Sequence, residues 1–167
     1  DVDEVANAIG TDKRIGSRFL QASVGFGGSC FQKDILNLVY LCESFGLPEV
    51  AAYWNQVVAM NDYQKRRFTN QLISALFNTV SGKKISLLGW AFKKDTGDTR
   101  ETPAVFVAKH LLEERAKLSI FDPQVSDRQI HNDADYYEIL PEKCEFDDLI
   151  SIAEDAYASV EGSHAVA

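Results

Sequence analysis

The sequence predicts an α/β protein in two parts: an all-helical region over residues 1–80 and an incomplete parallel-sheet domain over residues 81–167. Two observations support this division. Apolar side chains recur at helical spacing through most of the first part. The second part instead alternates short apolar runs with an amphipathic segment, which is the pattern of a βαβ unit.

Two helices are predicted ahead of a much longer one. Residues 2–9 place apolar side chains on one face and end at a glycine. A second helix over about residues 30–45 carries a single apolar stripe. Gly46 suits the left-handed position that follows a helix, and Leu47 can then close a Schellman-type contact back on Cys42.

A third helix is predicted from Pro48, which fits a first turn, to about Val80. Its length of about 30 residues is well beyond the average of about 11–12. Asn61-Asp62 is the point where it can kink or divide. Aromatic side chains on more than one side of so long a helix are typical of a segment that spans domains or lies in a subunit interface. Two ordinary core helices in tandem are the alternative.

The second part opens with a predicted strand over residues 83–92 and a charged loop over residues 93–101. A helix follows from Pro103 to about Arg115, and a second strand covers residues 117–122. Strand, helix and strand of these lengths predict a right-handed, parallel βαβ unit.

The remaining residues extend this unit. Residues 124–147 are polar and are predicted to be irregular, whereas the pattern from Leu149 onward indicates a strand, a short helix and the start of another strand. We therefore predict an incomplete Rossmann-like, doubly wound domain, joined to the helical region by the long helix. Both chain ends read as interrupted elements, so we expect a piece of a longer protein.

Composition excludes several classes of partner. The net charge of −8 argues against nonspecific binding of nucleic acid and against an anionic membrane surface. No apolar run approaches the roughly 18 residues that a membrane span needs. The cysteines, Cys30, Cys42 and Cys144, are odd in number and lack metal-ligand spacing, so we expect free thiols, no metal and a reducing, cytoplasmic setting.

Cys30 stands where the second helix begins, after three glycines in four positions. Ser29 and Gln32 match a capping box, with Ser29 as the N-cap and Cys30 as the first helical residue. Unpaired backbone N–H groups there favour a thiolate, and the glycines would leave room for a substrate. Asp34 lies one turn further on, where a carboxylate can orient or activate water. An inert cysteine after a glycine turn is the alternative, and Cys42 is expected to be core.

Longer motifs carry a family resemblance. VGFGGSCFQKD (24–34) resembles the catalytic cysteine segment of the UDP-glucose 6-dehydrogenase family, and FKKDTGDTRE (92–101) resembles its second hallmark. DKRIG (12–16) and MNDYQKRRF (60–68) match in order as well. The resemblance covers nearly the whole chain and weakens after about Val125.

The resemblance implies oxidation of UDP-glucose to UDP-glucuronate with two NAD⁺. Cys30 would add to an aldehyde to form a thiohemiacetal, later a thioester, and Asp34 would help water to hydrolyse it. Substrate contacts are implied for Arg14, which would reach a neighbouring subunit, and for Phe19, Gln21, Ser23, Gly25, Phe26, Gly27, Phe92 and Lys93. Cofactor contacts are implied for Cys30, Lys33 and Arg100.

The resemblance also bears on what the chain lacks. The family's NAD-binding domain and further catalytic residues lie upstream, so the isolated chain is expected to be inactive, and Asp122 is read as structural rather than cofactor-binding. The family dimerises through this region, so self-association through the central helices is expected. The alternatives are a sister enzyme acting on GDP-mannose or UDP-N-acetylmannosamine, and a noncatalytic oligomerisation module.

Overall fold

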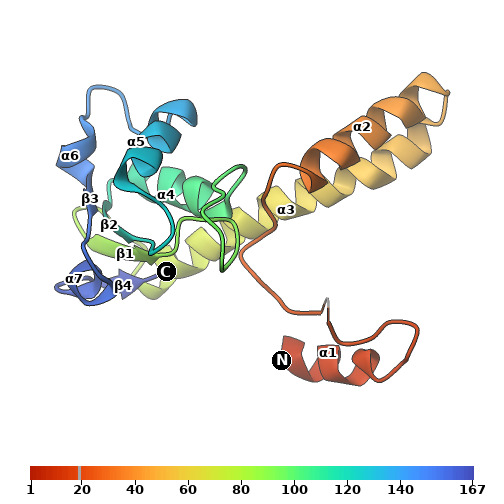
Figure 1. The fold of residues 1–167 in the computed structure, drawn as a ribbon, viewed down its shortest axis with the longest axis horizontal. Helices are drawn as coiled ribbons and strands as arrows, with labels where there is room; N and C mark the ends of the chain where they lie inside the picture. The colour runs from red at the N-terminus through yellow and green to blue at the C-terminus, as the bar shows by residue number, and fades with distance from the viewer. Residues whose placement is uncertain (19) are drawn as a thin grey trace.

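The computed structural model describes residues 1–18 and 20–167. These residues form seven helices and four strands (Figure 1). In chain order they are α1 (Val2–Gly10), α2 (Phe31–Ser44), α3 (Pro48–Ala75), β1 (Lys84–Leu88), α4 (Pro103–Glu113), β2 (Lys117–Phe121), α5 (Asp127–Tyr136), α6 (Phe146–Leu149), β3 (Ile150–Ile152), α7 (Ala156–Val160) and β4 (Ala165–Val166).

The helical part is dominated by an antiparallel pair, α2 and α3 (Figure 1). The predicted turn between them is confirmed: Gly46 is left-handed at φ +71°, and the Leu47 N–H donates to the Cys42 carbonyl at 2.9 Å. Helix α3 runs unbroken through Asn61-Asp62 for 28 residues and ends at Ala75, five residues before the predicted end. Helix α1 stands apart from the rest and has no buried residue.

The four strands form one parallel sheet in the order β3-β2-β1-β4. The chain moves outward from β1 to β2 to β3 and then returns to the other side of β1. Right-handed crossovers with this order put α7 on the face opposite to α4, as in a doubly wound sheet (Figure 1). The predicted α/β class is therefore confirmed.

The main core lies in the second part of the chain and surrounds the sheet. Trp90, Ile85, Leu111 and Ile120 are completely or almost completely buried there. The last turns of α3 contribute to the same core through Phe68, Leu72, Ile73 and Leu76. Helix α3 is thus anchored at one end in the sheet domain while its other end pairs with α2.

One sequence-based prediction was wrong between β2 and β3. Residues 124–147 were expected to be irregular, but they contain α5 and the first two residues of α6. Ser126 caps α5 by accepting the Gln129 N–H at 3.3 Å, and Ile130 and Ala134 are buried along one face. A short helix with a mostly polar surface gives a weak periodic signal, because only one narrow stripe has to be apolar.

The capping box at Ser29 was also wrong. The N-cap of α2 is Cys30, whose carbonyl accepts the Asp34 N–H at 2.9 Å. The Ser29 hydroxyl instead lies 3.5 Å from the Cys30 sulfur, and the Gln32 side chain donates to Glu101 at 3.4 Å. Contacts with a distant loop therefore replaced the local capping contacts.

Asp122 fixes the chain at the carboxyl ends of β1 and β2, which agrees with its expected structural role. Its carboxylate accepts the N–H groups of Trp90 at 2.6 Å, Ala91 at 2.9 Å, Gln124 at 2.7 Å and Val125 at 3.2 Å. Burial opposes ionisation, but the four hydrogen bonds outweigh it and lower the pKa of Asp122. This carboxylate is therefore stabilising in its charged form.

No helix among residues 1–18 and 20–167 has the length and apolar character needed to cross a membrane.

We predict that Asp122→Asn lowers the free energy of unfolding at pH 7 by about 1–3 kcal/mol, because an amide nitrogen cannot accept the N–H groups. A depressed pKa stabilises the fold fully above about pH 4, and this contribution is lost as the pH falls through the folded-state value. Urea unfolding should therefore show a smaller difference between wild type and variant at pH 3 than at pH 7. Asp135→Asn, at an exposed position of α5, is the control. An equal difference at both pH values would contradict the prediction.

Candidate functional site

The glycine loop, residues 25–28, is held between the two parts of the chain. On one side, the buried side chain of Asn61 accepts the Phe26 N–H at 2.9 Å and donates to the Phe26 carbonyl at 3.0 Å. On the other side, the Gly28 N–H donates to the Arg100 carbonyl at 2.8 Å. The loop thus connects α3 with the charged loop that follows β1.

The three glycines are required by atoms of the protein itself. A Cβ at Gly27 would lie 2.4 Å from the Glu101 carbonyl oxygen, and one at Gly25 would lie 2.7 Å from the Asn61 side-chain oxygen. Gly28 has φ +88°, and its Cβ would meet the Phe92 ring at 3.1 Å. The sequence had predicted that these glycines leave room for a substrate. In the structure, intrachain packing fills the space.

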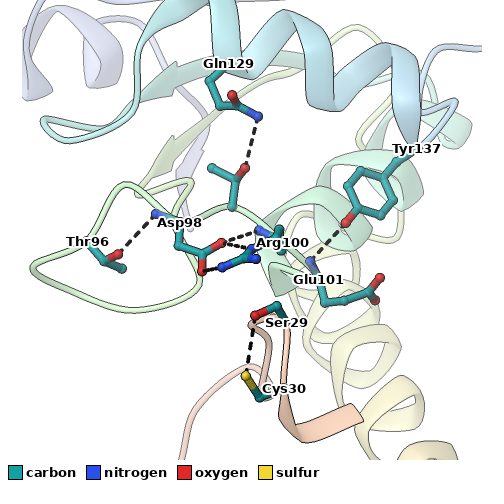
Figure 2. A network of polar contacts seen from close by, with 9 residues as sticks. Ser29, Cys30, Thr96, Asp98, Arg100, Glu101, Gln129 and Tyr137 are labelled. Atoms are coloured by element: carbon teal, nitrogen blue, oxygen red, sulfur yellow. Dashed lines mark hydrogen bonds and ion pairs between the residues drawn. The ribbon is translucent and has the colours of Figure 1, made fainter. Parts of the chain in front are cut away.

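Cys30 is exposed at the start of α2 (Figure 2). Its sulfur lies 3.5 Å from the Ser29 hydroxyl and makes no capping hydrogen bond with the amides of the first helical turn. Asp34 is exposed one turn further along the helix. The predicted position of the cysteine at a helix start is therefore correct to within one residue.

The charged loop over residues 92–101 carries a bidentate ion pair (Figure 2). Arg100 donates to Asp98 through Nε at 2.9 Å and through Nη2 at 2.7 Å. The hydrogen bond from Arg100 is the main reason why the pKa of Asp98 falls to about 2. The Phe92 N–H donates to the Asp98 carbonyl at 3.0 Å and closes the loop.

Helix α5 lies above this loop in the view of Figure 2 and is hydrogen-bonded to it. Gln129 bridges Asp133 at 2.8 Å and Thr99 at 3.4 Å, and the indole N–H of the buried Trp90 donates to Asp133 at 2.9 Å. Tyr137 follows the same helix, and its hydroxyl accepts the Glu101 N–H at 2.9 Å. The loop is therefore tied both to the core and to the end of α5.

Two cavities border these loops. The first, of about 550 Å³, lies at the carboxyl ends of β1 and β2. It brings together four of the residues predicted to bind substrate, Ser23, Gly25, Phe92 and Lys93. Ligands of open α/β sheets bind at this edge. These four residues therefore share a plausible binding cavity, although they are up to 70 positions apart in the sequence.

The second cavity, of about 540 Å³, is lined by Ser29, the residue before the cysteine, whereas Cys30 itself lines neither of the two cavities. Lys33 and Arg100, both predicted to contact a cofactor, line this second cavity together with Ser29. The other lining residues are Gly28, Gln32, Leu36, Thr99, Glu101, Gln129, Asp133, Tyr136 and Tyr137. The glycine loop therefore contributes to both cavities, with Gly25 in the first and Gly28 in the second.

The other predicted site residues lie elsewhere. Phe26 packs edge-on against Phe31 with ring centroids 4.7 Å apart, and Gln21 is exposed. Arg14 is 89% exposed in the segment after α1, where it pairs with Asp12. Phe19 lies outside the residues that the structure describes. Within the described residues, no group of three or more histidine, cysteine or acidic side chains could hold a metal ion.

Sequence reasoning missed the contribution of α5. Gln129, Asp133 and Tyr137 all line the second cavity, but residues 124–147 had been interpreted as irregular. A usable signal was present, because Ser126 and Gln129 have the spacing of a capping box. It would have predicted the helix, although not its contact with Glu101.

The parallel sheet, with a cavity at the carboxyl ends of β1 and β2, defines a doubly wound α/β protein. The UDP-glucose/GDP-mannose dehydrogenase family matches this chain through two sequence models, that of its central domain over residues 1–63 and that of its UDP binding domain over residues 86–167. The chain belongs to this family, as its motifs predicted.

Individual relatives agree with this membership. The chain is 58% identical over 166 residues to the UDP-glucose 6-dehydrogenases of Gallus gallus and Drosophila melanogaster, covering 99% of this chain and 33% and 35% of the relatives. Among solved structures, it resembles a UDP-glucose dehydrogenase from Pyrobaculum islandicum, with a TM-score of 0.76, 32% identity, and coverage of 98% of this chain and 34% of that one. The chain thus spans about a third of the proteins it matches.

We predict that Gly27→Ala destabilises the fold by about 2 kcal/mol or more, since the added methyl group meets a backbone carbonyl that cannot rotate away. Thermal unfolding is the measurement. Gly10→Ala is the control: that glycine also has no positive φ, and its Cβ would lie 3.2 Å from Cα and Cβ of Ser17, so a smaller loss of stability is expected there. Equal melting temperatures for the Gly27 variant and the wild type would show that the two loops do not pack as described.

Proposed function

We propose that the chain is the central and UDP-binding part of an NAD-dependent UDP-glucose 6-dehydrogenase. In this proposal, residues 1–80 are the helical central region and residues 81–167 the UDP-sugar-binding domain. The observation that carries the proposal is an exposed cysteine at the start of a helix, beside a loop that lines two cavities. The names of the relatives supply the substrate.

The first cavity suits the nucleotide sugar. Lys93 brings a positive charge to its wall, which would attract the pyrophosphate, and Ser23 offers a hydroxyl. Phe92 supplies an apolar surface that is held in place against Gly28. The N–H groups of Gly25, Phe26 and Gly28 already have acceptors within the chain. Side chains therefore have the larger share of the proposed binding.

Cys30 would act as the nucleophile. Its thiolate adds to the C6 aldehyde and gives a thiohemiacetal, whose oxidation leaves a thioester. Water then attacks the thioester carbon, the carboxylate forms, and the thiolate departs to take part in the next cycle. The start of α2, where Cys30 stands, and the guanidinium of Arg100 would stabilise negative charge on sulfur both before addition and on departure. Asp34 would orient or activate the attacking water.

The second cavity fits part of a dinucleotide. Lys33 and Arg100 provide cationic groups next to Ser29, where phosphates or the edge of a nicotinamide could be held. NAD⁺, when bound, supplies the hydride acceptor for both oxidation steps. The ion pair with Asp98 restricts the orientation of the Arg100 guanidinium.

We predict that this chain alone does not reduce NAD⁺ in the presence of UDP-glucose, whereas a longer protein that includes its upstream region does. In that longer protein, Cys30→Ser should lower kcat by about a thousandfold or more, because a hydroxyl is a poor substitute for the thiolate. Absorbance at the NADH band measures both. Turnover by the isolated chain, or full turnover by the serine variant, would contradict the proposal.

Asp34→Asn provides a second test in the same protein. If Asp34 assists hydrolysis, the thioester should accumulate on Cys30 and appear as an added sugar-nucleotide mass on the intact protein. The exposed Asn37 lies one turn further along the same helix, so Asn37→Asp is the control.

We also propose that a second copy of the chain packs on the α2–α3 pair. Large apolar side chains of these helices are exposed, including Tyr40, Phe45, Tyr53 and Met60 at 63–76%. An apolar area of this kind on a continuous helical surface supports an interface more than a solvated face.

We predict that Tyr53→Glu shifts the chain toward the monomer in sedimentation velocity, because a carboxylate would be desolvated in the interface. Tyr157→Glu is the control, since Tyr157 is 86% exposed on α7, away from this pair. A wild-type chain that stays monomeric at high concentration would contradict self-association through these helices.

A further inference from the structure

Glu101 adopts an unfavourable backbone conformation in contact with the glycine loop. Its φ is +52°, in the left-handed region that residues other than glycine rarely occupy. Such conformations persist only where neighbouring groups hold them, and they cluster at functional sites. Two groups hold this one: the Tyr137 hydroxyl accepts the Glu101 N–H at 2.9 Å, and the Gln32 side chain donates to the Glu101 carboxylate at 3.4 Å.

The conformation of Glu101 directs two carbonyl groups at the segment that leads into Cys30. The Glu101 carbonyl is the atom that leaves no room for a side chain at Gly27. The Arg100 carbonyl, one residue earlier, accepts the Gly28 N–H at 2.8 Å. Ser29 and Cys30 follow directly. The backbone angles at residue 101 therefore determine where the cysteine segment is held (Figure 2).

Tyr137 is itself well fixed. Its N–H donates to the Asp133 carbonyl at 2.9 Å as the C-cap of α5, and its ring packs edge-on against Phe106 with centroids 5.9 Å apart. The ammonium group of Lys109 donates to its carbonyl at 3.3 Å. Burial raises the pKa of Tyr137, although its contact with Glu101 opposes the shift, so the hydroxyl stays protonated at neutral pH. The Tyr137 hydroxyl is therefore held in place independently of the loop that contains Glu101.

We propose that the Tyr137 hydroxyl is a positioning group for Cys30, acting through Glu101 and the glycine loop. It keeps residue 101 left-handed, and residue 101 in turn keeps residues 27–30 in place. The inference rests on the proposed role of Cys30 as the nucleophile. It assigns a further function to the end of α5, beside the support that Gln129 and Asp133 give to the charged loop.

The test is Tyr137→Phe in the full chain, with Tyr157→Phe as the matched control on an exposed tyrosine. The first readout is the hydrogen exchange of the Gly28 amide by NMR, because that amide donates across the contact in question. We expect exchange about tenfold faster or more in the Tyr137 variant and no change in the control. Unchanged exchange at Gly28 would overturn the inference, whatever Cys30 does.

The second readout is the alkylation of each cysteine by iodoacetamide, resolved by peptide mass spectrometry. We expect Cys30 to react about threefold more slowly in the Tyr137 variant, because a displaced glycine loop would move its sulfur away from the start of α2. Cys144 serves as the reference, and the buried Cys42 reports global opening. A change shared by all three cysteines would mean lost stability and would overturn a positioning role.

A second-site variant separates positioning from stability. Glycine adopts left-handed angles without strain, so Glu101→Gly in the Tyr137→Phe background should bring Gly28 exchange back to within about threefold of wild type. Glycine at a left-handed position also relieves strain and stabilises the fold, so exchange of core amides is measured in the same samples. Recovery confined to Gly28 and its neighbours supports positioning, whereas equal recovery of amides throughout the core would overturn it. The proposed function would fail in a different way: Cys30 of the wild type would react no faster than Cys144, while Gly28 still responded to the Tyr137 variant.

Discussion

The site depends on the contact between two backbones that are more than 70 residues apart in the sequence. The Gly28 N–H meets the Arg100 carbonyl, and Gly27 lies against the carbonyl of Glu101. This contact brings a cysteine from the helical part next to a charged loop from the sheet domain. Without this contact, the glycine loop would not line both cavities, and Lys33 and Arg100 would not line the same cavity. Backbone groups, rather than charged side chains, therefore assemble the site.

Helix α3 is the rigid element that holds the two sides of this contact in place. Asn61 holds the glycine loop, while the buried Lys65 pairs with Asp62 at 2.7 Å and places its ammonium group 3.7 Å from the centre of the Phe106 ring on α4. These residues occupy adjacent turns of one unbroken helix, whose last turns enter the core of the sheet domain. A rigid element thus spans the two parts and limits how far the loops can separate.

The sequence predicted those features that depend on local periodicity. The helices at 2–9 and 30–45, the long helix, the βαβ unit and the final strand, helix and strand all appear, because each carries apolar residues at regular spacing in the sequence. The site was predicted through its motifs rather than its geometry. The Ser29 cap was wrong because Glu101, far along the chain, takes the Gln32 side chain. Helix α5 and the hydrogen bond that the Tyr137 hydroxyl accepts from Glu101 had no strong local sequence pattern. Their part in the site was therefore visible only in three dimensions.

The packing at Gly27 also limits how this protein can diverge. The atom that would collide with a side chain there belongs to the main chain of residue 101. Every amino acid carries that same carbonyl, so no substitution at residue 101 removes the clash. A clash with a side chain differs, because a smaller side chain would remove it. Any other residue at position 27 would require a rearranged loop. A single substitution at this position therefore cannot be neutral. Variation among descendants should therefore accumulate around this point and leave it unchanged.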